Sequence, residues 1–341
     1  MKKTISILLV LFMFVLTFTS CTSSPDTAGD ITGFAKNNTI IDRAVPSFTV
    51  DGDGDFTVLQ FSDTHLISGN TKKDIKTLDA VKAQINAVKP DLVVISGDMV
   101  EGNNKNEKYN KKTALEAVGT LFEDLNQYWA YVPGNNDGEK DGSSADVAAF
   151  LAQYAHCIIS NREDLTGATQ YAVDIKNTDG QLLHSLIFMD SLARDAESHY
   201  DYMKADQVQW AEDVLAEKKS ENPQVKCSFF FHMNTPNFAV SGKKGEAYSA
   251  NYSPVPKNFY EGIDGNAAFD AVVKNAECVG LVSIGHIHPK TNYCSFLNGT
   301  YYHIVRAAGY RLAKNPGCVQ ITIHTAAKDT KDMYTFAEIV F

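Results

Sequence analysis

The sequence has little positive charge for its length. Its 341 residues include 31 Lys and Arg against 41 Asp and Glu, a formal net charge of −10 at pH 7. An acidic surface repels the phosphates of a long nucleic acid, so we expect no nucleic-acid polymer as a partner. A small anionic ligand remains compatible with this charge where a bound cation supplies local positive potential.

Cysteine is also sparse, and no pair has the spacing of a metal knuckle. Beyond residue 21 the cysteines are Cys157, Cys227, Cys278, Cys294 and Cys318. Their odd number and apolar surroundings predict buried free thiols rather than a disulfide framework. One disulfide stays open as an alternative, because an oxidising compartment would permit it.

The N-terminal segment has the features of an export signal over residues 1–21. Lys2 and Lys3 precede an apolar core at 5–18, which is short for a membrane span. The small residues before Cys21 make the segment similar to a bacterial lipoprotein signal, in which Cys21 becomes lipidated. We therefore expect an exported protein anchored to the membrane of the bacterial cell envelope, with plain secretion as the alternative.

Residues 22–45 are predicted to be a flexible tether, because their first part is rich in Ser, Thr, Gly, Asp and Asn and has no hydrophobic period. Residues 46–341 are predicted to form one catalytic domain. Strand-like and helix-like segments alternate over most of it, which indicates an α/β protein. The C-terminal half is richer in strand pairs, including one joined by Asn298-Gly299, so we expect two sheets packed face to face with helices outside.

Polar residues follow five of the predicted strands. They are Asp63-Thr64-His65, Gly97-Asp98, Gly134-Asn135-Asn136-Asp137, His232 and Gly285-His286-Ile287-His288. The carboxyl ends of neighbouring parallel strands lie together, and Asp, His and Asn suit borderline divalent metals. Taken singly, each residue has an ordinary structural interpretation, such as a turn cap or a surface histidine. Taken together, they predict a metal site.

The order of these motifs resembles the calcineurin-like metallophosphoesterase superfamily over residues 55–310. Asp190-Ser191, Tyr202, Gln207 and Trp210, with the segment 306–310, are similar to its purple-acid-phosphatase-related branch. The resemblance implies a four-layer αββα sandwich of two mixed sheets. It also implies a metal-dependent phosphoric ester hydrolase, a phosphomonoesterase or phosphodiesterase acting on a small phosphorylated substrate.

The resemblance also implies residue roles. Asp63, His65 and His288 would hold one metal ion; Asn135, His232 and His286 would hold a second. Asp98 would bridge the two, which are divalent or trivalent ions such as Mn, Fe or Zn. The catalytic residues would be Asp98, Asn136 and Asp137, and a metal-activated hydroxide would attack the phosphate ester.

The sequence departs from the family pattern at two positions. Asn136 stands where the family usually has a His that contacts phosphate and helps to protonate the leaving group, and an amide cannot transfer a proton at neutral pH. We therefore add His199 as a candidate substrate contact, and keep a catalytically weak phospho-ligand-binding lipoprotein as the alternative function. Glu101 replaces the metal-binding Tyr of purple acid phosphatases, so we expect no tyrosinate–iron absorption band. A surface adhesin or structural lipoprotein without metal is a third hypothesis.

Overall fold

The computed structural model describes residues 29–341 except residues 53, 103–104 and 260–263. The predicted export signal with Cys21, and the first part of the predicted tether at 22–28, lie outside the described residues. Among the helices of the described part, none combines the length and the hydropathy needed to cross a membrane.

One sheet has six strands in the order β14-β13-β2-β3-β4-β5. Strands β2, β3, β4 and β5 run parallel to one another, whereas β13 pairs antiparallel with β2 and β14. The bounds are β2 Asp55–Phe61, β3 Leu92–Ser96, β4 Trp129–Val132, β5 Cys157–Ile158, β13 Gly317–His324 and β14 Tyr334–Val340.

The second sheet has eight strands in the order β1-β6-β7-β8-β10-β12-β11-β9. Strands β7, β8, β10 and β12 are parallel, and antiparallel β6 and β11 flank them. The bounds are β1 Phe48–Val50, β6 Gln170–Asn177, β7 Leu182–Met189, β8 Lys226–Phe230, β9 Glu246–Ala247, β10 Val279–Ile284, β11 Tyr293–Leu297 and β12 Thr300–Ile304.

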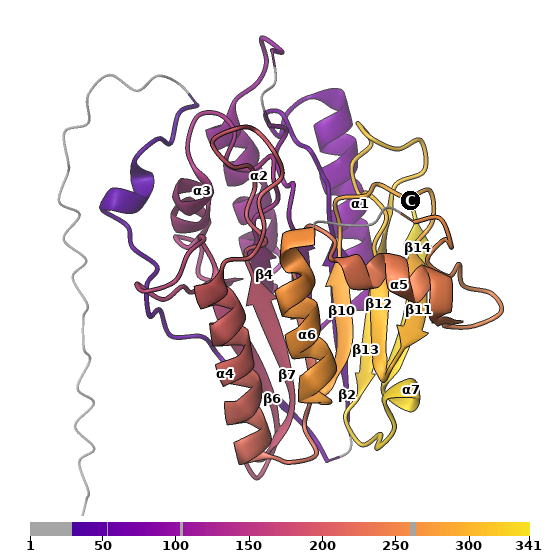
Figure 1. Cartoon of the computed structure of the whole chain (residues 1–341). Helices are drawn as coiled ribbons and strands as arrows, with labels where there is room; N and C mark the ends of the chain where they lie inside the picture. The colour runs from indigo at the N-terminus through magenta and orange to yellow at the C-terminus, as the bar shows by residue number, and fades with distance from the viewer. Residues whose placement is uncertain (1–28, 53, 103–104, 260–263) are drawn as a thin grey trace, which may run out of the picture.

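Helices cover the outer face of each sheet (Figure 1). The six-stranded sheet packs against α1 Lys72–Val88, α2 Lys111–Asp124 and α3 Ser144–Leu151. The eight-stranded sheet packs against α4 Ala205–Glu221, α5 Pro236–Lys244 and α6 Ala267–Ala276. A third apolar cluster fills the space between the sheets. The predicted four-layer αββα sandwich of two mixed sheets is therefore confirmed.

Strand β3 shows why the sheets stack in this way. Its residues Leu92 and Val94 point into the cluster between the sheets, and Val93 and Ile95 point into the cluster beneath the helices. All four are buried, so both faces of the strand are covered. Full burial of a Val, Leu or Ile side chain stabilises a protein by about 1.5–3 kcal/mol. Strand β3 therefore stabilises both the cluster between the sheets and the cluster beneath the helices.

The helix boundaries follow ordinary capping chemistry. The Thr71 side chain accepts from the backbone N–H of Asp74 at the start of α1, and Ser143 forms a capping box with Asp146 at the start of α3. Helix α1 is followed by Lys89 in a left-handed conformation, just before Pro90.

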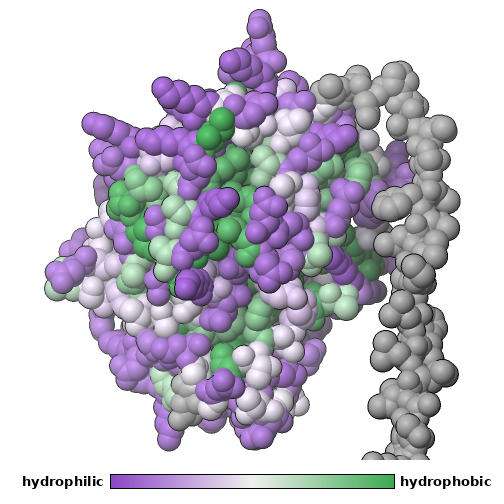
Figure 2. Space-filling view, turned by 180° about the vertical axis from the view of Figure 1, so that it is seen from behind, coloured by the Kyte–Doolittle hydropathy of each residue, from purple (hydrophilic) through white to green (hydrophobic). Residues whose placement is uncertain are grey.

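The outer surface carries mainly hydrophilic side chains interspersed with hydrophobic ones, as Figure 2 shows for one face.

The structure corrects the predicted tether in part. Ile31 and Ile40 are buried in the cluster that contains α3, and the backbone N–H of Ala35 donates to Asp146 at 2.9 Å. Residues 29–45, with the 3-10 turn Phe34–Lys36, therefore pack on the domain instead of forming a free linker. Phe34 stacks edge to face on Phe150, and Arg43 donates to the Ala152 carbonyl, so several contacts that the polar composition does not reveal dock the segment.

Other differences concern short elements. The strands β1, β5 and β9 and the helices α3, α5, α6 and α7 (Thr330–Met333) were not predicted from the sequence. Helix α5 follows β8 in a segment rich in Asn, Ser, Pro and aromatic residues. There Phe238 and Phe259 are buried, so these aromatic side chains pack the segment onto the domain. The five described cysteines are free and buried, which agrees with the prediction.

Candidate metal centre

The residues of the predicted site lie directly after strands β2, β3, β4, β8 and β10. Five of them have a positive φ: Asp63 (56°), His65 (44°), Asp98 (50°), His286 (68°) and His288 (49°). Left-handed backbone costs a non-glycine residue about 1–2 kcal/mol. Such strain at several adjacent residues is typical of functional sites, where the fold holds side chains in otherwise unfavourable positions.

Glycines before these residues allow the strand ends to meet. A Cβ at Gly97, whose φ is +92°, would overlap Nδ1 of His232. A Cβ at Gly285 would overlap Oγ of Ser62. Because neither position has room for a side chain, the Gly-Asp and Gly-His motifs need glycine for close approach.

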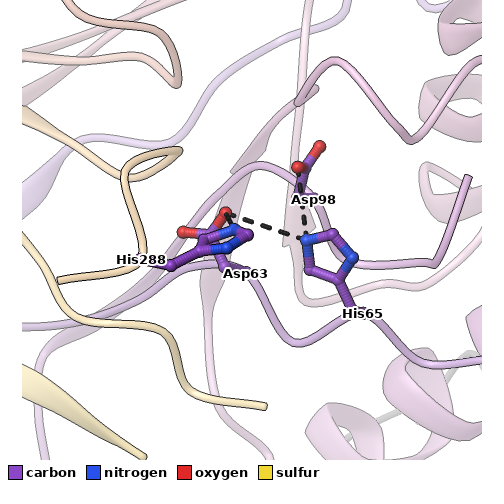
Figure 3. A group of neighbouring side chains, drawn as sticks. All are labelled: Asp63, His65, Asp98 and His288. Carbon is purple, nitrogen blue, oxygen red and sulfur yellow. Dashed lines mark hydrogen bonds and ion pairs between the residues drawn. The ribbon is translucent and has the colours of Figure 1, made fainter. Parts of the chain in front are cut away.

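Four ligand-type side chains converge at this edge of the two sheets. The candidate ligand atoms of Asp63, His65, Asp98 and His288 all lie within 4.8 Å of one another (Figure 3). Oδ2 of Asp98 lies 3.3 Å from Nε2 of His65 and 3.3 Å from Nε2 of His232. The Asp98 carboxylate thus sits between two imidazoles from different sheets, the position that a bridging ligand requires.

The other predicted ligands border the same cluster. Nε2 of His288 lies 2.9 Å from Oδ1 of Asp63, and the backbone N–H of His286 donates to Oδ2 of Asp63 at 3.1 Å. The rings of His286 and His232 meet edge to face with centroids 5.2 Å apart. Asn135 is buried. The fold therefore gathers the side chains that the sequence proposed as ligands, although which of them bind metal remains a prediction.

Several polar atoms here lack a well-formed hydrogen bond among the described residues. They are both ring nitrogens of His65, Nε2 of His232 and Oδ1 of Asn135. A buried polar atom without a partner is costly, and these nitrogen and oxygen atoms are ligands that borderline divalent cations accept. The donor set therefore fits a metal ion by its chemistry as well as by its shape.

The charges of the cluster are coupled. Burial by itself lowers the pKa of His65, but Asp98 and Glu101 outweigh it and raise this pKa to about 10. Burial also lowers the pKa of His232, but the nearby Asp98 carboxylate outweighs burial and raises this pKa to about 9. Burial also raises the pKa of the Asp98 carboxyl, yet His232 and His65 bring it well below its usual range. Cations would compete with these protons, so metal binding should strengthen as pH rises.

Two acceptors outside the cluster orient the imidazoles. The Ser96 carbonyl lies 2.8 Å from Nδ1 of His232 and can only accept, so Nε2 of His232 is left facing the cluster. Oε2 of Glu101 lies 3.3 Å from Nδ1 of His65, within ion-pair distance although the two atoms form no well-aligned hydrogen bond, and its charge favours a proton on Nδ1, which leaves Nε2 of His65 toward Asp98. Such partners fix the tautomer of a metal-binding His. From the sequence, Glu101 is notable only because it replaces a Tyr. Its contact with His65 has no sequence signature.

We expect Glu101→Ala to weaken metal affinity by about 10–100-fold, the usual effect of removing an outer acceptor of a ligating His. Titration calorimetry with Mn²⁺ on the metal-free chain measures this directly. Glu107→Ala, an exposed Glu in the same region, is the control and should bind as the unchanged protein does. Equal affinities for the two variants would show that Glu101 does not support His65.

Asp137 has a different place from the one expected of a catalytic residue. Its Oδ2 accepts from Tyr131 OH at 2.9 Å and from the Gly134 N–H at 2.8 Å. Its Oδ1 accepts from the Val100 N–H at 3.0 Å. Both oxygens are thus engaged by donors of the surrounding loops, and the side chain is fully buried. The Asp137 side chain thus holds together the loops that follow β3 and β4, and its part in catalysis stays a prediction.

Asn136 lies against the centre. Its backbone N–H donates to Oδ1 of Asp98 at 2.8 Å, and its amide Nδ2 donates to Oδ2 of Asp98 at 2.6 Å. The residue that stands in place of the family's usual His is therefore at the predicted location, where it engages Asp98.

His199 is not brought to the cluster. Its side chain is 71% exposed, and its ring nitrogen lies 3.5 Å from Asp195 and 3.7 Å from Glu197. The neighbouring Tyr200 contacts the site instead, with its ring 5.1 Å from that of His286. The Arg194 guanidinium lies 4.4 Å over the Tyr200 ring. Sequence reasoning missed both residues because a single Tyr or Arg in a loop belongs to no motif.

Comparisons with known proteins agree with this geometry. A family model described as calcineurin-like phosphoesterase matches residues 56–290. The chain is 24% identical over 301 residues to "Probable inactive purple acid phosphatase 28" of Arabidopsis thaliana, covering 77% of this chain and 73% of that protein. It is 23% identical over 323 residues to "Probable inactive purple acid phosphatase 14" of the same plant, covering 83% and 77%.

A solved structure of a dimetal phosphatase from Danio rerio has the same fold. The two share 13% sequence identity with a TM-score of 0.53, over 83% of this chain and 99% of that chain. Identity this low supports a shared fold alone. The family model, however, spans well over half of the sequence and includes strand-end motifs that the fold brings together. The chain therefore belongs to the calcineurin-like phosphoesterase family.

Proposed function

We propose that this protein hydrolyses phosphate esters with two metal ions held at the ends of the two sheets. The observation that carries the proposal is Asp98, whose Oδ2 lies 3.3 Å from one His on each side. A carboxylate between two sets of N and O donors is what a pair of cations sharing one ligand needs. Membership of the phosphoesterase family supports the same chemistry.

The residue roles follow the arrangement of the donors. Asp63, His65 and His288 would hold the first ion, and Asn135, His232 and His286 the second, with Asp98 shared between them. Bound cations would lower the pKa of a shared water, so that hydroxide can attack the ester, and would neutralise charge on the phosphoryl group. Mn, Fe and Zn all suit this mixture of imidazole, amide and carboxylate donors.

Side chains around the candidate metal centre would contribute to catalysis in addition to the metal ions. Asn136 can donate hydrogen bonds to a phosphoryl oxygen if it releases Asp98, but it cannot protonate a leaving group. Arg194 lies over the Tyr200 ring, which contacts His286, so its guanidinium can stabilise negative charge that develops there. This combination favours esters whose leaving groups need no proton. We therefore propose small phosphate esters with acidic leaving groups as preferred substrates.

The first test is hydrolysis of an aryl phosphomonoester and an aryl phosphodiester, each with and without added Mn²⁺ or Zn²⁺. Turnover that depends on metal would support the proposal, and the better substrate would narrow the ester class. Complete lack of turnover on both esters, with metal bound, would argue against it.

A second candidate is a protein that binds a phosphorylated ligand and turns it over poorly. The contact of Asn136 with Asp98 favours it, because no proton donor occupies the usual position. The word "inactive" in the names of two relatives is consistent with it. Phosphate binding to the metal-loaded chain without turnover would select this candidate over the first.

We further propose that the protein works outside the cytoplasm, anchored to the cell envelope through a lipid on Cys21. The support is the sequence of residues 1–21, with its basic start, apolar core and Cys21 after small residues. The intact chain should fractionate with membranes, and Cys21→Ala should release it. A Cys21→Ala chain that stays in the membrane fraction would rule out the lipid anchor.

A further inference from the structure

A chain of polar side chains crosses the apolar space between the sheets, directly below the candidate metal centre. It joins Gln60 on β2, Ser96 on β3, Ser283 on β10 and His303 on β12, and all four are fully buried. Oγ of Ser283 donates to Oε1 of Gln60 at 2.6 Å, and Nε2 of Gln60 donates to Oγ of Ser96 at 2.9 Å. Buried polar groups are costly unless they are satisfied, so such a chain needs an explanation.

The donors and acceptors of the chain have one consistent direction. Since the Ser283 hydroxyl donates to Gln60, it accepts from Nδ1 of His303, 2.9 Å away. Nε2 of His303 then accepts from Tyr252 OH, also at 2.9 Å. This assignment needs a neutral imidazole, and burial indeed lowers the pKa of His303 to about 3. Each of these side chains therefore has a hydrogen-bond partner. The chain forms a rigid link between the two sheets, here called the strut.

The strut lies close in sequence to the residues of the site. Gln60 precedes Asp63 on the same strand end, Ser96 precedes Asp98, and Ser283 precedes His286. The six-stranded sheet supplies Asp63, His65, Asp98 and Asn135, whereas the eight-stranded sheet supplies His232, His286 and His288. The predicted donors of each ion therefore come from both sheets, and their spacing depends on how the sheets sit on each other.

Apolar packing alone fixes the position of one sheet on the other only loosely. Hydrophobic contacts are non-directional, whereas a hydrogen bond loses strength quickly when its length or angle changes. The bond between Ser283 and Gln60 joins residues 223 apart in sequence and crosses from one sheet to the other. The bond from His232 to the Ser96 carbonyl crosses nearby. Together they restrict the sheets beside the cluster.

We propose that the chain Ser96–Gln60–Ser283–His303 positions the two halves of the metal centre at the spacing that a pair of cations requires. These residues touch neither substrate nor metal and act through the strand ends. The inference rests on the proposed function, because it presupposes two bound ions.

A second buried polar contact between the sheets offers a matched control. Oγ of Ser228 on β8 lies 2.8 Å from Nε2 of His184 and 3.1 Å from Tyr334 OH on β14. Ser228 is fully buried and, like Ser283, bonds to a buried His. It stands further from its strand end than Ser283 does. Ser228→Ala should therefore lower stability as Ser283→Ala does, without moving the ligands.

The experiment measures Mn²⁺ binding by calorimetry and the magnetic coupling of the two ions by EPR spectroscopy. We expect the unchanged protein to bind two coupled Mn²⁺ ions. Ser283→Ala and Gln60→Leu should weaken the second ion by about 10–100-fold, the size of effect known for supporting residues, and reduce the coupling. Ser283→Thr, which keeps the hydroxyl, should restore part of both. Ser228→Ala should leave both unchanged.

Other outcomes decide against the proposal. Unchanged Mn²⁺ affinity and coupling in Ser283→Ala would overturn it, as would an equal loss in Ser228→Ala. If Ser283→Ala does not fold, Ser96→Ala removes one hydroxyl of the chain and keeps the carbonyl that faces His232, and the same criteria apply to it. An unchanged protein that binds fewer than two Mn²⁺ ions would overturn both this inference and the proposed function, which separates the two kinds of failure.

Discussion

Asp98→Asn is expected to lower kcat/KM for a phosphate ester by at least about 10³-fold, the upper range found when one stabilising group is removed from an active site. The substitution keeps the shape but removes a charge from the point between His65 and His232. The amide also offers only one acceptor oxygen, so it cannot serve two cations equally. Steady-state hydrolysis at saturating Mn²⁺ measures the effect.

The loss must be separated from misfolding. Asp179→Asn, in the exposed turn between β6 and β7, is a control that changes the same chemical group away from the centre. The Asp98 variant should keep its circular dichroism spectrum but bind fewer than two Mn²⁺ ions. Activity within a few-fold of the unchanged protein would show that Asp98 is not shared between two ions, and the proposed role would be wrong.

Asn136→His is expected to raise kcat for a phosphate ester whose leaving group needs a proton. It restores a group that can donate a proton near neutral pH, and general-acid help is typically worth about 10²–10⁴-fold. The gain should appear with phenyl phosphate, whose leaving group needs a proton. It should be small with 4-nitrophenyl phosphate, whose leaving group departs without one. The ratio of kcat values for the two esters is therefore the measurement.

The structure indicates what the new side chain must do. It must give up the hydrogen bond that Asn136 makes to Oδ2 of Asp98 and turn toward the substrate. Space there is restricted, since a Cβ at Gly102 would lie 2.6 Å from Oδ1 of Asn136 and would overlap Oε2 of Glu139. Asn136→Gln is the control, because it changes size without adding a proton donor of suitable pKa.

Three results would count against this account of Asn136. Equal stimulation of both esters by Asn136→His would mean that the introduced imidazole acts by binding phosphate rather than by protonating the leaving group. No stimulation of either ester, with metal binding intact, would favour the alternative of a binding protein whose slow turnover has another cause. Stimulation by Asn136→Gln would indicate a steric effect.

Much of this molecule was predictable from local sequence. The wholly apolar run at 92–95 predicted a strand buried on both faces, and apolar residues at helical spacing over 75–88, followed by Pro90, predicted the helix that is α1. Parallel strands place their carboxyl ends at one edge, so Asp63, Asp98 and His286 were expected to meet. The reason for the glycines before Asp98 and His286 came from the structure, where neither position has room for a Cβ.

The docking of Ile31 and Ile40 was not predicted, because the apolar residues of this segment are scattered among polar ones and have no regular period. The exchange of His199 for Tyr200 depended on the conformation of an exposed loop, in which adjacent side chains point in different directions. Asp137 looked catalytic by its place in a motif, but its two oxygens are filled by donors of folded loops.

The sequence by itself thus determined the layers, the strand ends and the kinds of side chain that gather there, because these depend on periodicity and on short motifs. Only the tertiary structure decided which neighbours support them. Glu101 lies beside His65 because β2 and β3 are neighbours in one sheet, whereas Ser283 bonds to Gln60 across 223 residues because the two sheets stack at one particular angle and depth. That relation is the sum of many weak packing contacts spread over the whole chain, so no local stretch of sequence encodes it.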